Sequence, residues 1–339
     1  MMNHNDFPKM TEEFDHSVRR ALDSLPERES KPVRRFSAKK IVCAGLAAAL
    51  CIGGTAFAAN AQSWFPLLFP NGGDANLEGY VQTADNAKLT DENDSYRMSV
   101  ESVLFDESAG TGVISLHLEN KKQDGVKPFT LAHLIDSYRN KPDITWSTLS
   151  SCYAEEGQLD FEVMYGDSGF CGSEFYLNTA RSTDNDYYFE GAFAISSDYR
   201  QGEPLRLEAL EPGKTTVRAD GAGTAKTVLA VDLPEFQQMP YLTSENGDVT
   251  LSQIGIRIRN ADMHCTVDEV DKLSVQLRDG SEYVILDENA DIDRTLYTYG
   301  FNSTEDTDRI DTEIAVLARA FDLDNVQSVT INGEVYPLS

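Results

Sequence analysis

Hydrophobic residues form one uninterrupted run near the N-terminus of the chain. Residues 41–59 read IVCAGLAAALCIGGTAFAA and include no charged side chain. As an α-helix that rises about 1.5 Å per residue, a run of this length reaches across the hydrocarbon core of a bilayer. The pattern therefore predicts a transmembrane helix from Ile41 to Ala59, with the lipid bilayer as a partner.

Charges on the two sides of this run predict the direction of crossing. The residues just before it include a basic cluster with no acidic residue among them: Lys31, Arg34, Arg35, Lys39 and Lys40. The first charge after the run is Asp74. By the positive-inside rule, residues 1–40 lie in the cytoplasm and the C-terminal bulk of this cell-membrane protein is extracellular. Trp64, Phe65 and Phe69 are then expected at the outer membrane interface.

A cleaved signal peptide is the competing interpretation of the same run. Ala56-Phe57-Ala58 fits the small-x-small pattern that signal peptidase recognises. The 40 residues before the run are much longer than the charged region that opens an ordinary signal peptide. The retained anchor is therefore the favoured interpretation.

The segment before the run has the pattern of a short amphipathic helix, at about residues 11–25. Thr11 can cap this helix, and Phe14, Val18 and Leu22 recur at every fourth position on one face. A leader that is only cleaved and discarded needs no such helix. This apolar stripe is the candidate partner-binding surface on the cytoplasmic side.

Small residues line one face of the predicted membrane helix. Gly45, Ala49 and Gly53 recur every four residues, a spacing that lets two helices approach closely. The spacing is compatible with a homodimer through the membrane helix. A run rich in alanine and glycine also produces it by chance.

Beyond Pro70 the hydrophobic pattern changes to short alternating runs separated by turn residues. This pattern predicts a mainly β outer part. The expected strands are 96–105, 112–119, 144–149, 159–165, 174–179, 187–195, 205–210, 226–232, 249–259, 272–277, 283–286, 326–331 and 334–338. Asn332-Gly333 between the last two is a strong hairpin signal.

The outer part has too many residues for one sandwich. We therefore expect two β-sandwich-like domains, at residues 75–233 and 234–339, joined to the membrane helix by a linker at 60–74. Asp311–Ala320 is the best helix candidate outside the membrane, because Ile314, Leu317 and Phe321 would share one helical face.

Acidic residues are concentrated outside the predicted membrane. Residues 1–40 carry 9 Lys or Arg and 7 Asp or Glu, whereas residues 41–339 carry 20 and 49. Nucleic-acid binding depends on basic residues that neutralise phosphates, so this balance argues against DNA or RNA as a partner. It also keeps the outer part soluble.

Five cysteines are present, and two of them lie within the apolar run, where they act as small hydrophobic residues. Of the other three, Cys152 and Cys171 are flanked by strand-like sequence. They form a candidate disulfide if the outer part is extracytoplasmic, which leaves Cys265 unpaired. Three cysteines also allow two other pairings.

Fragments that resemble nucleophile or phosphate sites fail on their surroundings. Gly166-Asp167-Ser168-Gly169 resembles a serine-protease nucleophile segment, but His133 is too near in sequence for the rest of a triad to fit between them. A turn between strands explains it better. Residues 221–227 resemble a phosphate loop, but the Gly before Lys226 is missing and no helix pattern follows.

Metal signatures are also incomplete. The histidines lack the paired spacing of a zinc site, although His264 adjoins Cys265. Residues 287–293 alternate acids as in a calcium loop, but Ile292 replaces the glycine that the turn requires. We interpret these acids as solvated loop residues. We accordingly predict no catalytic residue, no metal, no cofactor and no enzyme activity.

Three segments together resemble a family of Gram-positive single-pass membrane proteins of unknown function. They are residues 14–26 (FDHSVRRALDSLP) before the basic cluster, 100–106 (VESVLFD) and 322–333 (DLDNVQSVTING). Members are often described as anti-sigma-factor-like and are frequently encoded beside an extracytoplasmic-function sigma factor. The resemblance also implies an immunoglobulin-like β ectodomain.

The resemblance implies signal transduction: residues 1–40 bind a sigma factor while the outer domains sense envelope conditions, and proteolysis of the anchor is one route to release. Phe14, Val18 and Leu22 would then contact the sigma factor as a helix in a groove. The leader departs from the best-known anti-sigma domain, because it is short and lacks the His-x-x-x-Cys-x-x-Cys zinc signature. The alternative is an anchored or secreted β-sandwich binding or adhesion module without a sigma partner.

Overall fold

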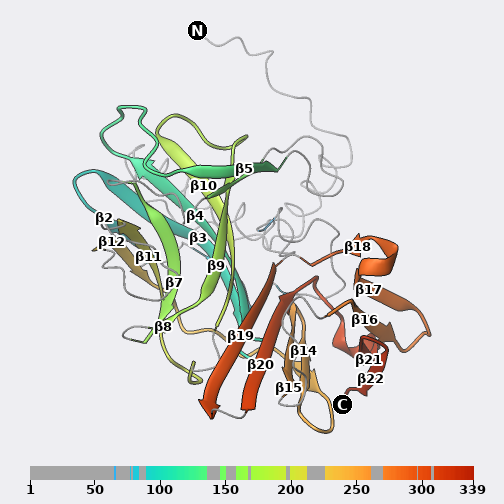
Figure 1. Ribbon diagram of the computed structural model, residues 1–339. Helices are drawn as coiled ribbons and strands as arrows, with labels where there is room; N and C mark the ends of the chain where they lie inside the picture. Colours follow the sequence, from blue (N-terminus) through green and yellow to red (C-terminus); the bar gives the residue numbers. More distant parts are fainter. Residues whose placement is uncertain are drawn as a thin grey trace, which may run out of the picture. The chain divides into compact units, whose positions relative to one another are not determined.

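A computed structural model describes residues 65, 77, 79–83, 89–135, 146–149, 158–166, 169–195, 199–211, 226–260, 270–295, 297–306 and 309–339. All of them belong to one compact unit, Gly54–Ser339. Within these ranges no helix has the length and apolar character that crossing a membrane requires. The predicted span at Ile41–Ala59 and the predicted leader helix lie outside the described residues. The structure is mainly β, as predicted (Figure 1).

One large antiparallel sheet dominates the strands up to Asp232. Its order is β1-β3-β4-β10-β9-β6-β5, and β2 also pairs with β3. We call it sheet A, and its strands are β1 (Gln82–Thr83), β2 (Thr90–Glu92), β3 (Tyr96–Asp106), β4 (Thr111–Asn120), β5 (Leu131–Ile135), β6 (Trp146–Leu149), β9 (Gly172–Asn178) and β10 (Asp186–Ala194). The strands expected at 96–105 and 112–119 are confirmed as β3 and β4, which pair with each other.

Sheet A packs face to face on a smaller sheet, which we call sheet B. Sheet B contains β7 (Asp160–Tyr165), β8 (Gly169–Phe170), β11 (Leu205–Glu211) and β12 (Lys226–Asp232), in the order β12-β11-β7-β8. Alternate residues of β4, such as Ile114, Leu116 and Leu118, point into the core between the sheets. We call this pair of sheets the first sandwich.

The open edge of sheet B is covered by side chains of the β2 region. The Ala230 N–H donates to Asp91 Oδ2 at 2.9 Å, and Asn93 Nδ2 donates to the Val228 carbonyl at 3.4 Å. Unpaired backbone groups at a sheet edge invite pairing with other chains. These two side chains form hydrogen bonds with backbone groups of β12, to which an added strand would otherwise bind.

The strands from Tyr241 onward form two further antiparallel sheets. Sheet C, in the order β13-β14-β15-β20-β19, contains β13 (Tyr241–Thr243), β14 (Val249–Ser252), β15 (Gly255–Asn260), β19 (Tyr297–Asp306) and β20 (Arg309–Leu317). Sheet E, in the order β18-β17-β16-β21-β22, contains β16 (Lys272–Leu277), β17 (Glu282–Asp287), β18 (Ile292–Asp293), β21 (Val326–Ile331) and β22 (Glu334–Pro337). Two short 3₁₀ helices, η3 (Glu288–Ala290) and η4 (Leu323–Asn325), connect strands.

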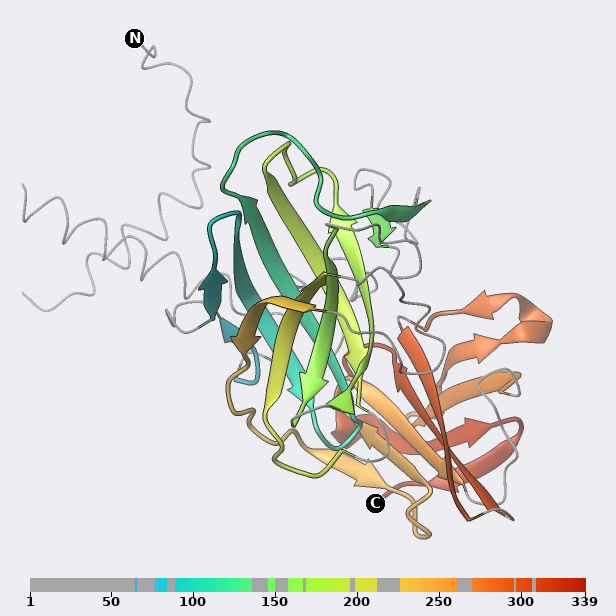
Figure 2. The same ribbon diagram turned by 60° about the vertical axis from the view of Figure 1, so that its left-hand side comes forward.

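Sheets C and E enclose a second apolar core, so we call them the second sandwich. Figure 2 shows its strands in orange and red, and those of the first sandwich in blue to yellow. The hairpin predicted at the C-terminal end is confirmed, since β21 pairs with β22 across Asn332 and Gly333. Both turn residues have positive φ, 49° and 88°, which is the conformation that Asn-Gly favours. The division into two domains near Leu233 stays a prediction.

The single strand predicted for residues 249–259 is wrong. The chain reverses between β14 and β15, which pair with each other. The reversal is stabilised by Ser252, whose Oγ accepts the N–H groups of Ile254 and Gly255 at 3.2 and 3.1 Å. A serine side chain can thus stabilise a tight turn inside a run that alternates like one long strand.

The helix predicted at Asp311–Ala320 is also wrong, because β20 occupies most of this segment between β15 and β19. Ile314 and Val316 face the core of the second sandwich, whereas Leu317 lies in a different apolar cluster. A spacing of three residues shares one face of a helix but lies on opposite faces of a strand. Both faces of β20 are buried, so apolar residues occupy consecutive positions in this strand and their spacing does not indicate a helix.

The outer face of sheet A contacts the second sandwich through an apolar cluster that we call the contact cluster. Its members are Phe65, Leu77, Leu104, Val113, Tyr176, Ala192, Met239, Ile254, Leu317 and Ala320. Phe65 is fully buried in it, so its predicted place at the membrane interface is wrong. The protein itself, rather than lipid, covers this ring.

A glycine on the inner face of sheet A provides a stability test. A Cβ at Gly112 would lie 2.2 Å from the Phe193 ring, whereas a Cβ at Gly79 would meet nothing within 4 Å. Gly112→Ala is expected to lower the free energy of unfolding by about 1–3 kcal/mol, because the core must overpack. Urea unfolding of the purified full chain measures it. Gly79→Ala is the matched control, with an expected change within about 0.5 kcal/mol; equal effects of both would contradict the packing.

Candidate functional site

The first sandwich has a cavity of about 510 Å³ where the chain leaves for the second sandwich. Its wall comes from three segments: the end of β3 with the following turn, the loop before β11, and the linker after β12. The first segment contributes Phe105 and Glu107. The second contributes Tyr199 and residues 202–205, and the third contributes residues 233–238. A cavity at a junction of this kind is a common place for a ligand.

Aromatic rings form one side of the cavity. The Phe105 ring lies edge-to-face with Phe236 at 5.3 Å between centroids and with Tyr199 at 6.2 Å. Tyr199 also meets Tyr165 at 5.5 Å. Phe105 and Phe236 therefore hold the linker against the end of β3.

Glu107 fixes the opposite loop by accepting hydrogen bonds across the cavity wall. Its Oε1 accepts the Gly202 N–H at 2.7 Å and the Tyr199 hydroxyl at 3.0 Å, and its Oε2 accepts Gln201 Nε2 at 3.1 Å. Hydrogen bonds to a charged acceptor are stronger than neutral ones. The carboxylate thus ties two segments that lie about 95 residues apart in sequence.

The environment of Tyr199 keeps its hydroxyl protonated. Burial raises the pKa of this phenol, and the neighbouring Glu107 carboxylate raises it further by charge repulsion and by accepting its hydrogen bond. Tyr199 is therefore a hydrogen-bond donor at neutral pH and has no role as a base.

The cavity suits a ligand that combines positive charge with an apolar stem. Glu107, Glu203 and Glu235 contribute to its wall, and none of the lining residues is Lys or Arg. Aromatic faces and carboxylates both attract ammonium and guanidinium groups. Among the described residues there is no group of three or more His, Cys, Asp or Glu side chains that could hold a metal ion.

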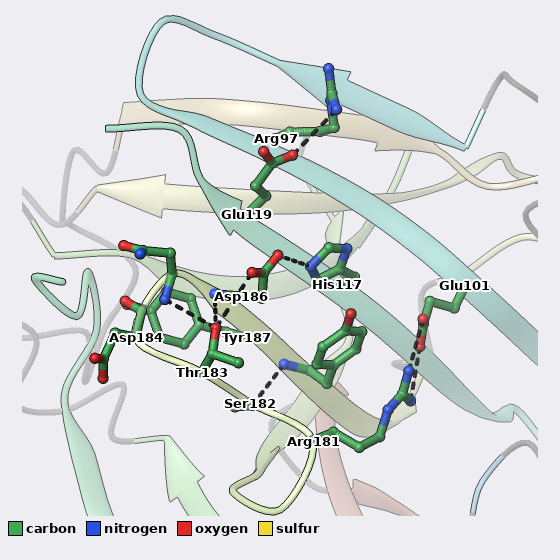
Figure 3. Close-up of polar contacts among 12 residues, drawn as sticks. Arg97, Glu101, His117, Glu119, Arg181, Ser182, Thr183, Asp184, Asp186 and Tyr187 are labelled. Atoms are coloured by element: carbon green, nitrogen blue, oxygen red, sulfur yellow. Dashed lines mark hydrogen bonds and ion pairs between the residues drawn. The ribbon is translucent and has the colours of Figure 1, made fainter. Parts of the chain in front are cut away.

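A group of polar and aromatic side chains lies on the outer face of sheet A (Figure 3). His117 Nε2 lies 3.0 Å from Asp186 Oδ1, and the His117 ring stacks on Tyr188 at 4.4 Å. The Arg181 guanidinium lies 4.0 Å from the centre of the Tyr188 ring and pairs with both Glu101 oxygens at 3.1 and 3.2 Å. These residues interact with one another and connect β3, β4 and β10, which indicates a structural role.

The predicted site residues fall largely outside the described part. This holds for Phe14, Val18 and Leu22, for Gly45, Ala49 and Gly53, and for Cys152. Cys171 is buried with a free thiol, and burial raises its pKa. Because Cys152 is not described, the disulfide stays a prediction.

The rejected serine-protease motif is confirmed as a turn between strands. β7 and β8 pair across it, and Gly166 has a φ of 55°. A Cβ at Gly169 would lie 2.1 Å from the Tyr165 ring, so the second glycine makes room for that ring. Ser168 lies outside the described residues, as does the side chain of His133.

The interpretation of the calcium-like acids as loop residues is wrong for two of them, because Asp287 ends β17 and Asp293 lies in β18. Asp287 Oδ1 accepts the Ala290 N–H at 3.2 Å at the start of η3, and Asp293 Oδ1 accepts the Thr295 N–H at 2.9 Å. Residues 221–225, His264 and Cys265 lie outside the described part, whereas Lys226 and Thr227 begin β12.

The structure is that of a mainly β protein of packed antiparallel sheets, with a cavity lined by acidic and aromatic side chains beside the linker. No family model, no curated protein and no solved structure matches the chain.

Removing the Glu107 carboxylate tests the construction of the cavity wall. Glu107→Ala is expected to cost about 1.5–3 kcal/mol of unfolding free energy, because the Gly202 N–H loses its charged acceptor. Urea unfolding measures this cost, and proteolysis of the 199–205 loop should become faster. Glu235→Ala, an exposed acid on the linker, is the control and should change little. Equal costs for the two variants would show that Glu107 does not hold the loop.

Proposed function

We propose that this chain is a single-pass membrane regulator of the anti-sigma type. Residues 1–40 bind an extracytoplasmic-function sigma factor in the cytoplasm, and the outer sandwiches bind a signal ligand. In this proposal residues 75–233 and 234–339 act as separate immunoglobulin-like domains, and the linker between them carries the cavity. The charge-free run at 41–59 and the basic cluster before it support the membrane topology.

One observation carries the proposal beyond the resemblance. Phe65, six residues after the end of the predicted span, is buried in the contact cluster together with Leu104 and Leu317. The chain that leaves the membrane therefore enters the place where the two sandwiches meet. A ligand that changes this contact has a direct physical path to the membrane helix.

The composition of the cavity indicates the chemistry of the ligand. Three glutamates and the rings of Phe105, Tyr199 and Phe236 favour an ammonium or guanidinium group on an apolar stem. The acidic charge outside the membrane would also speed the approach of a cationic ligand. A basic peptide is the ligand class that fits both properties.

The cytoplasmic half of the proposal predicts a complex that can be isolated. Full-length chain in detergent should co-purify with one of the host's extracytoplasmic-function sigma factors, co-expressed one at a time. Replacing Phe14, Val18 and Leu22 together by Ser should abolish co-purification, because the apolar stripe is lost. Replacing Glu13 and Arg20, which lie on the opposite face of the predicted helix, by Ala is the control and should keep the complex.

The alternative of an anchored binding module without a sigma partner gives a different result. In that case no sigma factor co-purifies, and the Ser variants behave as the parent chain does. This outcome would contradict the regulator proposal.

A further inference from the structure

The surface where the two sandwiches meet contains buried polar groups beside its apolar cluster. Ser102, Asp106 and Thr111 are fully buried and lie on the face of sheet A that carries Leu104 and Val113. Among the described residues, Ser102 Oγ, Asp106 Oδ2 and Thr111 Oγ1 have no hydrogen-bond partner. Each such atom costs free energy while the surface is closed and regains hydrogen bonds when water reaches it.

The second sandwich also has a buried polar atom that lacks a hydrogen-bond partner in the described part. This atom is Gln253 Oε1, in the turn between β14 and β15. The Ser252 hydroxyl, in the same turn, donates to the Gly255 carbonyl at 3.2 Å. Of the five such atoms among the described residues, four lie on these two faces, and the fifth is Arg206 Nε on β11. Buried polar atoms that lack a partner lower the free energy needed to separate the surface.

The closest approach across this surface depends on a glycine. A Cβ at Gly255 would lie 2.4 Å from Thr111 Oγ1 and 3.0 Å from the Cβ of Ala109. Gly255 begins β15 on the face opposite the core of the second sandwich, since Ile256 points into that core. A side chain at this position would push the β3–β4 turn away from β15.

The same β3–β4 turn forms part of the cavity. Asp106 lies at the contact, and the next residue, Glu107, holds the cavity wall. On the other side of the cavity, Phe236 packs on Phe105, and Met239 three residues later is buried in the contact cluster. A ligand in the cavity would therefore touch both segments that lead into the contact.

We propose that the contact between the two sandwiches opens reversibly, and that its closed form holds the juxtamembrane chain through Phe65. Occupation of the cavity beside the linker shifts the balance between the closed and open forms. The role in signalling rests on the proposed function, whereas the opening itself rests on the geometry alone.

Asp106 adds a pH dependence to this contact. Burial raises the pKa of its carboxyl, although the N–H groups of Ser108 and Ala109, which donate to its Oδ1, oppose the rise. The charged groups near it are Glu107 in the same turn and Arg257 on β15, whose Nη1 lies 3.4 Å from a Cβ placed at Gly110. The protonated carboxyl is favoured in the closed form, so the contact is strongest at low pH and weakens as pH rises through the raised pKa.

Hydroxyl-radical footprinting of the full chain in nanodiscs tests the proposal, because it reports the exposure of single side chains. Gly255→Ala should raise the oxidation of both Phe65 and Met239 by about tenfold, because the added methyl group overpacks the contact between the sandwiches. Met98 and Phe189, which lie in the core of the first sandwich, should be unchanged. Gly79→Ala is the matched glycine control and should change none of the four.

Asp106→Asn should act in the opposite direction at neutral pH. The amide keeps an oxygen for the N–H groups of Ser108 and Ala109 and places a donor where Oδ2 lies. Oxidation of Phe65 and Met239 should fall below the parent value and lose its dependence on pH.

Two outcomes of Gly255→Ala would overturn the proposal. If Met98 and Phe189 gain reactivity along with Phe65, the sandwiches unfold together and no separable contact exists. If Met239 alone gains reactivity, the contact does not hold the juxtamembrane chain. Neither result depends on a sigma factor, so a failed co-purification with normal footprinting would reject only the proposed function.

Discussion

The packing of sheet A's outer face against the second sandwich is the interaction on which the rest of the arrangement depends. In most sandwiches one face of each sheet is covered and the other is exposed to water. In sheet A, Leu104 and Val113 point away from the inner core and are nevertheless fully buried, beside Ile254 and Leu317 of the second sandwich. Burial of this apolar surface positions the linker, and with it the cavity whose wall the linker completes.

Electrostatics has a different role at each end of the outer face of sheet A. The exposed ion pairs, such as Arg97 with Glu92 at 2.7 Å, lie in water and contribute little to stability. Burial in the contact raises the pKa of Asp106. Pairing with Arg97 lowers the pKa of the exposed Glu92. A carboxylate thus lies on a solvated surface in one place and in a pH-sensitive contact in the other.

Local patterns predicted the hairpins because turn chemistry and strand alternation act over a few residues. The pairing of β3 with β4 and the Asn332-Gly333 turn follow directly from such patterns. β20 was mistaken for a helix because tertiary packing buries both of its faces, which removes the alternation that marks a strand. The cavity could not be predicted, since Phe105, Tyr199 and Phe236 come together only after the sheets pack. The one local signal near it is Pro234, which separates two series of strands.

The central claim is that a defined contact joins the two sandwiches and can open. Its most direct test is the distance between spin labels at Val126→Cys and Val335→Cys, exposed positions in the first and second sandwich, with Cys152 and Cys265 replaced by Ser. A narrow distance distribution is predicted in the parent chain, and it should broaden in Gly255→Ala but remain narrow in Gly79→Ala. A broad distribution in the parent chain that Gly255→Ala leaves unchanged would contradict the account.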